Sequence, residues 1–441
     1  MATLARSSID RDIAPGAQPL GPLIAALDVG VSKTVCLATR RDPVLDMHPE
    51  RPLRVLGVGV QTAPAIASGK PADFEGCARA IAVAIDEASA MAGAPIKRVT
   101  ACYSGPGLSS RIVRANVRVR GKTVSARDID AAIDAVMAAA ASAQSAILHL
   151  EPLRYMIDGG EPLLDPLSFP GRSLVLEACV VTAPSEALAA LKACIGWAGA
   201  EVEDVVAAPR AAGLAVLSPD ERDGGALVVD IGAGSIGLAA FAGEGLVHVE
   251  TISAGGVRLT RDLAHKLETT FAAAERVKLA FGAVRGACDP RETVPAPRVG
   301  MDGRLEAATA LRGAIADTLT PRLVEMLLLV RHRLARAGFS GANAPARAVL
   351  VGGGAQAPGI RELASDTLGM PARIGRPLDI CGFDTGEAGP GYAAAAGLLR
   401  WRLEAPTLED VEIQFQPSLL QTAAAMRNAA TGAWAWLREN F

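Results

Sequence analysis

The sequence predicts an α/β fold in which two related halves flank an inserted α+β segment. Two observations support this prediction. A short apolar strand that runs into an Asp and then a glycine turn occurs once in each half, at Asp28 and at Asp230. On both sides of the middle of the chain, short apolar runs alternate with stretches of helical periodicity, which is typical of sheets covered by helices.

In the first half, apolar runs bounded by turns predict strands, and one longer periodic stretch predicts a helix. The expected strands are Leu23–Leu27, Val35–Ala38, Leu53–Val60 and Val99–Tyr103, and the expected helix is Asp73–Ala92. Residues 1–21 mix charged residues with Gly and Pro and lack an apolar signal-peptide core. They are therefore expected to form a disordered tail.

The inserted segment, residues 105–182, has a different pattern. Strands are expected at Ser110–Val119, Ala146–Ile157 and Ser173–Val181. A helix is expected after Ser125, because acidic residues lie in its first turn. The stretch Ala135–Leu150 is too polar for a membrane span and predicts an Ala-rich helix.

The second half repeats the strand–turn–strand arrangement and adds long helices. Strands are expected at Ala226–Val229, Gly237–Phe241, Leu246–Ile252 and Ala348–Val351. Helices are expected at Ser185–Ala198, Arg258–Ala283 and Ala307–Ala337. These elements complete the second α/β half.

The composition is that of a folded protein. Half of the 441 residues are hydrophobic and 21% are charged, which excludes a mainly disordered chain. The net charge of −3 provides no bulk attraction to nucleic acid. Seven scattered cysteines contain no C-x-x-C pair. They indicate neither a zinc site nor a disulfide framework, and they suit a reducing cytosol.

The two Asp-containing turns are candidates for phosphate binding. They read Asp28-Val29-Gly30-Val31-Ser32-Lys33 and Asp230-Ile231-Gly232-Ala233-Gly234-Ser235. Each predicts a β-hairpin tip at which backbone N–H groups can approach phosphate oxygens, because Gly has no Cβ. The Asp cannot bind phosphate directly, but it can hold a hydrated Mg²⁺ ion.

Other readings of these turns are weaker. Gly232, Gly234 and Gly237 spell G-x-G-x-x-G, yet the next residues predict strand–turn–strand rather than the helix of a dinucleotide fold. Lys33-Thr34 lacks the spacing of a P-loop. Either turn alone is better explained by a structural hairpin. Their duplication, together with a third glycine turn after a strand, favours phosphate binding.

A third glycine turn, Gly352-Gly353-Gly354, follows the strand Ala348–Val351. Such a turn lets a flat ring or a sugar approach the backbone. Upstream, Glu275 and Lys278 share a helix face at positions i and i+3. They could bracket a ribose and a base edge, or form an ordinary surface ion pair.

Taken together, the three turns resemble the phosphate 1, phosphate 2 and adenosine motifs of the actin/Hsp70/sugar kinase superfamily. Within it, the chain resembles the FtsA family of bacterial actin-like cell-division proteins over about residues 22–402 and at its extreme C-terminus. The supporting segments are Ala146–Asp158, Ala183–Leu217, Ala254–Gly282 and Pro390–Leu399.

The resemblance implies an actin-like, duplicated RNase H-like fold with two such subdomains, 1A and 2A, an inserted SHS2-like α+β subdomain 1C, and a helical subdomain 2B. Subdomain 1A would comprise residues 22–104 and 183–222, and 1C residues 105–182. Subdomain 2A would comprise residues 223–256 and 339–402, and 2B residues 257–338. A linker, 403–429, and an amphipathic helix, 430–441, would follow.

The resemblance also implies that ATP and Mg²⁺ bind in the cleft between the halves. By motif, the ATP-binding residues would be Asp28, Gly30, Ser32, Lys33, Asp230, Gly232, Gly234, Ser235, Glu275, Lys278, Gly352, Gly353 and Gly354. Asp28 and Asp230 would hold Mg²⁺ through water. Val31 replaces a Thr usual in the family, and Ala233 and Ser235 replace a Gly and a Thr. With no identified catalytic base, the expectation is weak or no ATPase activity.

Aromatic residues make up only 4% of the chain, yet Trp434, Trp436 and Phe441 lie within its last eight residues. Helical phasing places them on one broad arc with Leu437. So short a helix is marginal in water and would be stabilised in a membrane interface. Docking on the protein's own surface is the alternative. The resemblance favours membrane targeting.

As a function, the resemblance implies polymerisation on the cytoplasmic face of the bacterial inner membrane, at the division septum. The chain would tether FtsZ there and recruit later divisome proteins through 1C. Arg304, Arg312 and Arg322 in 2B could bind the acidic C-terminal peptide of FtsZ, or form a solvated helix face. A sugar or acetate kinase is the alternative, but the sequence shows no signature of its carboxylate base.

Overall fold

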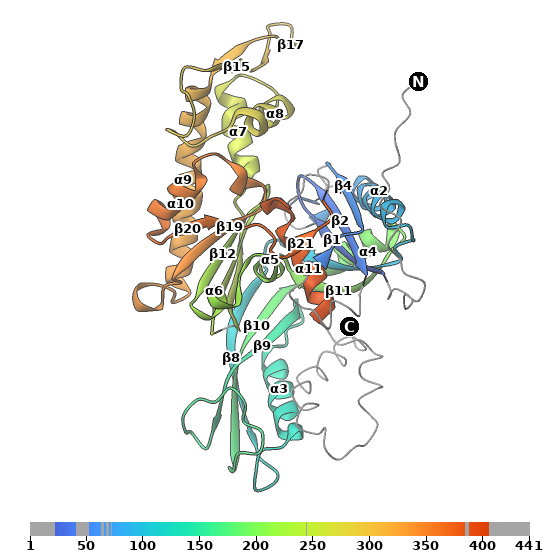
Figure 1. Cartoon of the computed structure of the whole chain (residues 1–441), viewed down its shortest axis with the longest axis vertical. Coiled ribbons are helices and arrows are strands. Elements are labelled where there is room, and N and C mark those ends of the chain that lie inside the picture. Colours follow the sequence, from blue (N-terminus) through green and yellow to red (C-terminus); the bar gives the residue numbers. More distant parts are fainter. Residues whose placement is uncertain are drawn as a thin grey trace, which may run out of the picture.

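The computed structural model describes residues 23–40, 53–62, 66–67, 70–71, 73–243, 245–383 and 388–404. The expected N-terminal tail, most of the expected linker, and the expected membrane helix with Trp434, Trp436, Leu437 and Phe441 lie outside the described residues. The described part forms four lobes (Figure 1). Two sheet-containing lobes lie side by side, a mainly helical lobe stands at one end, and the insert extends at the other.

The first lobe is built on a five-stranded sheet in the order β11-β7-β1-β2-β4. Its strands are β1 (Leu23–Val29), β2 (Thr34–Arg40), β4 (Gly57–Gln61), β7 (Arg98–Tyr103) and β11 (Glu201–Ala207). Alternate residues of β1 serve two cores, because successive side chains of a strand point to opposite faces. Leu27 packs with helices α2 (Phe74–Ala92) and α4 (Ser185–Trp197). Ala26 packs on the other face, with helices α5 (Ala208–Val216) and α11 (Ala393–Glu404).

The second lobe and the insert share one eight-stranded sheet in the order β20-β19-β12-β13-β14-β8-β10-β9. The strands of the second lobe are β12 (Ala226–Ile231), β13 (Ile236–Ala242), β14 (Gly245–Ile252), β19 (Arg347–Val351) and β20 (Ala372–Ile374). Those of the insert are β8 (Ser109–Arg118), β9 (Ser145–Ile157) and β10 (Ser173–Pro184). The join between them is one residue pair, Glu250 opposite Ser109, beside a hydrogen bond from Thr251 N to Leu108 O of 3.1 Å.

The insert has its own core, in which helix α3 (Ala126–Ala140) packs against the strands. Ser125 is the N-cap residue of α3, as expected, and it forms a capping box with Asp128. Asp128 Oδ2 accepts hydrogen bonds from Ser125 N (2.9 Å) and Ser125 Oγ (2.6 Å). The prediction of a helix across Ala135–Leu150 is wrong, because α3 ends at Ala140 and β9 begins at Ser145.

The helical lobe contains α7 (Gly256–Lys266), α8 (Phe271–Phe281) and α9 (Arg312–Arg336). The sequence predicts one helix over Arg258–Ala283, but the chain turns between α7 and α8, where Glu268 adopts a φ of 50° and Thr270 caps α8. Helix α9 begins later than expected, because the residues before it form two nested antiparallel strand pairs. These are β15 (Thr293–Pro295) with β18 (Thr309–Leu311), and β16 (Arg298–Val299) with β17 (Leu305–Glu306).

Shorter elements complete the described chain. They are β3 (Leu53–Arg54), β5 (Ile66–Ala67), β6 (Lys70–Pro71), α6 (Pro219–Asp223), η1 (Gly341–Asn343), η2 (Gly353–Gln356), α10 (Ile360–Leu368), β21 (Ile380–Cys381) and η3 (Pro390–Tyr392). The expected strand Leu53–Val60 is divided, because β3 pairs with β21 while β4 pairs with β2. Among the described residues, none of the helices combines the length and apolar character of a membrane span.

Two central helices, α5 (Ala208–Val216) and α11 (Ala393–Glu404), pack against each other beneath the junction of the first two lobes (Figure 1). Their approach depends on Gly397, where an added Cβ would lie 1.7 Å from Ala211 O. No side-chain rotation can relieve a contact between a Cβ and backbone. Gly397 therefore sets the separation of the two helices.

Replacing Gly397 by alanine should destabilise the fold by roughly 1–3 kcal/mol or more, as overpacking in a tightly packed core does. The measurement is urea denaturation of the full chain. The matched control is Gly196→Ala on α4, where a Cβ would meet no atom within 4 Å. That change should be neutral or stabilising by up to about 1 kcal/mol, because alanine favours helix. Equal effects of both changes would contradict this account.

Candidate functional site

The two Asp-containing turns are hairpins closed in the same way. In the first, between β1 and β2, Gly30 N donates to Lys33 O at 2.9 Å. In the second, between β12 and β13, Gly232 N donates to Ser235 O at 2.9 Å. A Cβ on Gly30 would lie 2.9 Å from Lys33 O. The duplicated motif of the sequence is thus a duplicated backbone structure.

The tips of the two hairpins touch. A Cβ on Gly234 would lie 2.5 Å from Val31 Cγ2, so Val31 of the first hairpin packs directly against the glycine of the second. Ser235 Oγ donates to Ser104 O at 3.0 Å, next to the start of the insert. Ser32 is exposed at the tip of the first hairpin. The residues assigned to phosphate 1 and phosphate 2 therefore do come together.

Lys33 is held between the first hairpin and the start of α11. Its Nζ donates to Gly391 O at 2.7 Å and lies 4.6 Å from the centre of the Tyr392 ring. Burial lowers the pKa of Lys33, and attraction from Asp28 and Asp230 opposes this effect. The amine is thus a partly buried positive charge beside the two predicted carboxylates.

Asp28 and Asp230 are half-buried, and their carboxyl groups lie close enough to repel each other. Burial raises the pKa of Asp230 to about 7, with a further contribution from Asp28 and a counteracting one from Lys33. Burial also raises the pKa of Asp28, while a hydrogen bond from Cys102 and the charge of Lys33 lower it. Two carboxylates therefore face one ammonium group.

This charge arrangement fits a divalent cation. A cation between these two half-buried carboxylates would offset both their repulsion and their desolvation. Within the described part of the chain, no group of three or more His, Cys, Asp or Glu residues is placed to ligate a metal. Asp28 and Asp230 would thus hold Mg²⁺ mainly through water and with the help of a ligand's phosphates, as this ion prefers.

The third glycine turn packs closely against the second hairpin. Gly352 has a φ of 82°, and a Cβ there would lie 2.3 Å from Asp230 Oδ1 and 2.7 Å from Ile231 O. A Cβ on Gly354 would lie 2.3 Å from Ile231 Cγ2. By contrast, a Cβ on Gly353 would meet no atom within 4 Å. The turn therefore needs glycine at two of its three positions to pack beside Asp230.

Glu275 and Lys278, on α8, bind each other with an Oε2–Nζ distance of 2.7 Å. Both also contact the hydroxyl of Thr260 on α7, to which Lys278 Nζ donates at 2.8 Å. Lys278 reaches Gly256 O at 3.2 Å, and Gly256 N donates to Gly232 O at 3.0 Å. The pair is thus joined to the second hairpin rather than standing alone on the surface.

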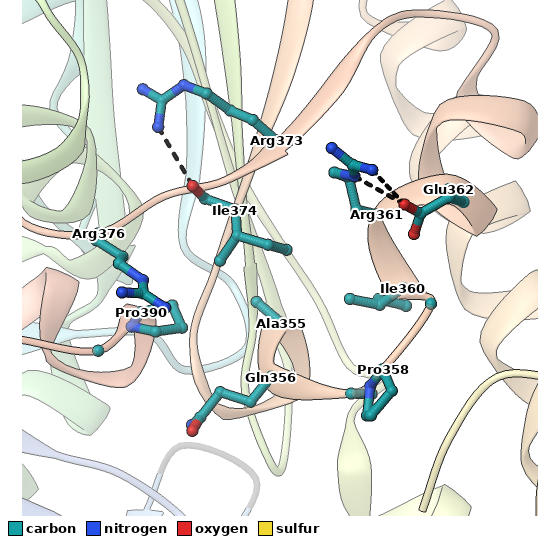
Figure 2. A pocket seen from close by; sticks show the side chains of 13 residues that line it. Ala355, Gln356, Pro358, Ile360, Arg361, Glu362, Arg373, Ile374, Arg376 and Pro390 are labelled. Atoms are coloured by element: carbon teal, nitrogen blue, oxygen red, sulfur yellow. Dashed lines mark hydrogen bonds and ion pairs between the residues drawn. The ribbon is translucent and has the colours of Figure 1, made fainter. Parts of the chain in front are cut away.

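A cavity of about 820 Å³ opens beside the third turn (Figure 2). Gln356, Arg361, Glu362, Arg373, Arg376 and Pro390 are among the residues that line it. Arg361 Nε donates to Glu362 Oε1 at 2.9 Å, and Arg373 is paired with Glu221. Pro390, which lines the cavity, directly precedes Gly391, whose carbonyl binds Lys33.

Four residues at or beside the site were not predicted from the sequence: Cys102, Thr260, Gln356 and Tyr392. Gln356 could have been found, since it follows the third glycine turn by two positions. Nothing in the sequence marks the other three, because they reach the site only through tertiary packing.

The three arginines suggested for peptide binding do not form one cluster. Arg312 at the start of α9 pairs with Glu292 at 2.7 Å, and Arg322 pairs with Asp262 at 2.7 Å. Arg304 lies between β16 and β17, and its side chain is 88% exposed. Each of the first two would have to exchange its present partner to bind an acidic peptide.

The fold and the arrangement of the three turns define an actin-like protein. Two solved structures share this fold. The PilM–PilN type IV pilus biogenesis complex matches 86% of this chain and 98% of its own, with 20% identity and a TM-score of 0.61. MreB5 of Spiroplasma citri bound to ADP matches 90% and 99%, with 14% identity and a TM-score of 0.52.

Sequence comparisons define the family. The family described as "Cell division protein FtsA" matches residues 227–397, and "SHS2 domain inserted in FTSA" matches residues 105–182. The chain is 32% identical to cell division protein FtsA of Agrobacterium fabrum over 95% of both chains. It is 31% identical to that of Pseudomonas aeruginosa over 87% of this chain and 90% of the relative.

The chain therefore belongs to the FtsA family of cell division proteins. The actin-like fold with an inserted SHS2 subdomain, expected from the resemblance, is confirmed.

Proposed function

We propose that the chain binds ATP with Mg²⁺ between its two halves and assembles into filaments on the inner membrane, where it tethers FtsZ at the division septum. The observation that supports this most is the meeting of both Asp-containing hairpins, Lys33 and the third glycine turn at one place. Closely approached backbone N–H groups, an ammonium group and a cation held by carboxylates are what a nucleotide's phosphates require.

Two further features support binding of the nucleoside part of ATP. The Glu275–Lys278 pair is linked to the second hairpin through Gly256 and offers a carboxylate and an ammonium group to a ribose. The cavity beside Gln356 and Pro390 offers space for a base next to the third turn. In this proposal, phosphate 1 and phosphate 2 hold the phosphates, and Asp28 and Asp230 hold Mg²⁺ through water.

The site favours binding over turnover. Asp28 and Asp230 are placed to retain a cation, whereas no residue is identified that would orient an attacking water. ATP would therefore control assembly, with weak or no hydrolysis. The competing proposal of a sugar or acetate kinase has no support from the relatives, which are cell division proteins.

Membrane attachment is proposed from the C-terminal sequence. If residues 430–441 form a helix, the phasing of the sequence would place Trp434, Trp436, Leu437 and Phe441 on one apolar face. Arg304, which is exposed on the helical lobe beside Asp302, would bind the acidic FtsZ peptide together with Arg312 and Arg322. Recruitment of later divisome proteins would involve the insert.

Sedimentation with liposomes of bacterial lipid composition tests this proposal. The full chain with Mg²⁺ and ATP should pellet with the vesicles and form filaments on them, because the apolar face would bury in the interface. Removing residues 430–441 should abolish pelleting while leaving ATP binding unchanged. A matched control replaces Arg438 by glutamine, which keeps the apolar residues.

The outcomes separate the two parts of the proposal. Equal pelleting of the truncated and full chains would exclude the C-terminal tether. Pelleting and filaments that are the same with and without ATP would exclude nucleotide control of assembly.

A further inference from the structure

Cys102 lies at the base of the candidate nucleotide site, yet no motif of the sequence marks it. It belongs to β7, a central strand between β1 and β11, and only 3% of it is exposed. Its Sγ lies 3.1 Å from Asp28 Oδ1, within hydrogen-bonding distance for sulfur. Another buried cysteine of the same sheet, Cys36 on β2, packs instead in the apolar core between the sheet and α2.

The direction of this hydrogen bond follows from chemistry. A carboxylate accepts hydrogen bonds and a thiol can donate one. Burial and the nearby charges of Asp28 and Asp230 raise the pKa of Cys102 well above its usual range, so the thiol keeps its proton. Cys102 is thus a neutral donor, which adds no further negative charge to the pair of carboxylates.

The hydrogen bond from Cys102 restricts the orientation of the Asp28 carboxyl group beside the first hairpin. Asp28 lies next to the first hairpin, whose turn is closed by Gly30 and Lys33. With Oδ1 engaged by the thiol, the rotation of the carboxyl group is limited and Oδ2 remains for the water shell of a cation. Asp230 is restricted differently, by the close approach of the Gly352 backbone.

We propose that Cys102 is a positioning residue for the metal-dependent part of nucleotide binding, acting by orienting Asp28 through its thiol hydrogen bond. This inference rests on the proposed function, because it assigns a role within the same Mg²⁺–ATP site. It assigns Cys102 no contact with the nucleotide itself.

The test measures ATP affinity of the full chain by calorimetry, once with excess Mg²⁺ and once with EDTA. The ratio of the two affinities is the metal-dependent gain. Cys102→Ala should reduce this gain by about tenfold, because a hydrogen bond to a charged group is lost. The affinity in EDTA should stay within about twofold of the parent chain, since the phosphate-binding turns are unchanged.

Two further variants make the result specific. Cys102→Ser keeps a donor of similar size and should restore most of the metal-dependent gain. Cys36→Ala removes a buried thiol from β2, two strands away from Cys102 in the same sheet, and should lower the melting temperature without changing the gain. This pair separates a positioning effect from a loss of packing.

Each of the following results would overturn the positioning role of Cys102. A metal-dependent gain in Cys102→Ala equal to that of the parent chain would overturn the positioning role and leave the nucleotide site standing. A Cys102→Ser variant as weak as Cys102→Ala would also overturn it, because packing and not donation would then be responsible. A parent chain without any metal-dependent ATP binding would overturn the proposed site together with this inference.

Discussion

Replacing Gly352 by alanine should abolish Mg²⁺-dependent ATP binding, with affinity lower by about 100-fold or more. The added Cβ would lie 2.3 Å from Asp230 Oδ1 and 2.7 Å from Ile231 O. The residue also has a φ of 82°, where alanine costs roughly 1–2 kcal/mol. Both effects displace the third turn or Asp230, and each 1.4 kcal/mol lost is a factor of about ten in affinity. Calorimetry with ATP and Mg²⁺ is the measurement.

The adjacent glycine provides a matched control. A Cβ on Gly353 would meet no atom within 4 Å. Gly353→Ala should therefore leave the fold intact, and binding should change by less than about tenfold. If Gly352→Ala bound ATP as well as Gly353→Ala, Asp230 and the third turn would not act together in the site.

Replacing Asp230 by asparagine should stabilise the protein at pH 8 in the absence of divalent cations, by at most about 4 kcal/mol. The folded-state pKa of Asp230 is raised from its ordinary 3.8 to about 7. Between these values the folded protein holds a proton that the unfolded chain releases, so stability falls as pH rises through this range. Asparagine is neutral throughout and lacks this loss.

The measurement is urea denaturation of the parent chain and of Asp230→Asn at pH 4.5 and pH 8, without and with Mg²⁺ and ATP. The two proteins should be similar at pH 4.5 and diverge at pH 8. Mg²⁺ and ATP should then stabilise the parent at pH 8 but not the variant. If the two proteins differed in stability by the same amount at pH 4.5 and at pH 8, the raised pKa of Asp230 would not be the cause of the difference.

Local patterns in the sequence were enough to predict the two hairpins and the insert. Each hairpin is closed by a hydrogen bond between residues three apart, Gly30 with Lys33 and Gly232 with Ser235. Such contacts are encoded within a few residues by the glycines themselves. Ser125 likewise marks the start of α3, because a capping box is a local structure.

The failed predictions concern residues whose partners are distant in sequence. The stretch after Ala140 has helical composition, but pairing of β9 with β10 draws it into the sheet. The turn between α7 and α8 depends on Glu268 in a left-handed conformation, which an apolar pattern does not show. The contact of Cys102 with Asp28 joins positions 74 residues apart, so only the fold brings it about.

In the candidate site, too, local features could be predicted from the sequence, whereas contacts between distant residues could not. The sequence could identify which glycines approach a ligand, but not that Val31 fills the space above Gly234 or that Lys33 rests on Tyr392. The arginines Arg312 and Arg322 look available in sequence, whereas the fold pairs them with Glu292 and Asp262. Ion pairs across elements carry no local signature.

The join between β14 and β8 has a mechanical consequence. Both covalent connections of the insert lead into the first lobe, through β7 and α4, while its sheet continues into the second lobe at Glu250 and Ser109. The insert therefore bridges the two lobes, by covalent connections on one side and by strand pairing on the other. Any rotation of one lobe against the other would strain this pairing, together with the hydrogen bonds from Thr251 N to Leu108 O and from Val249 N to Ser110 Oγ.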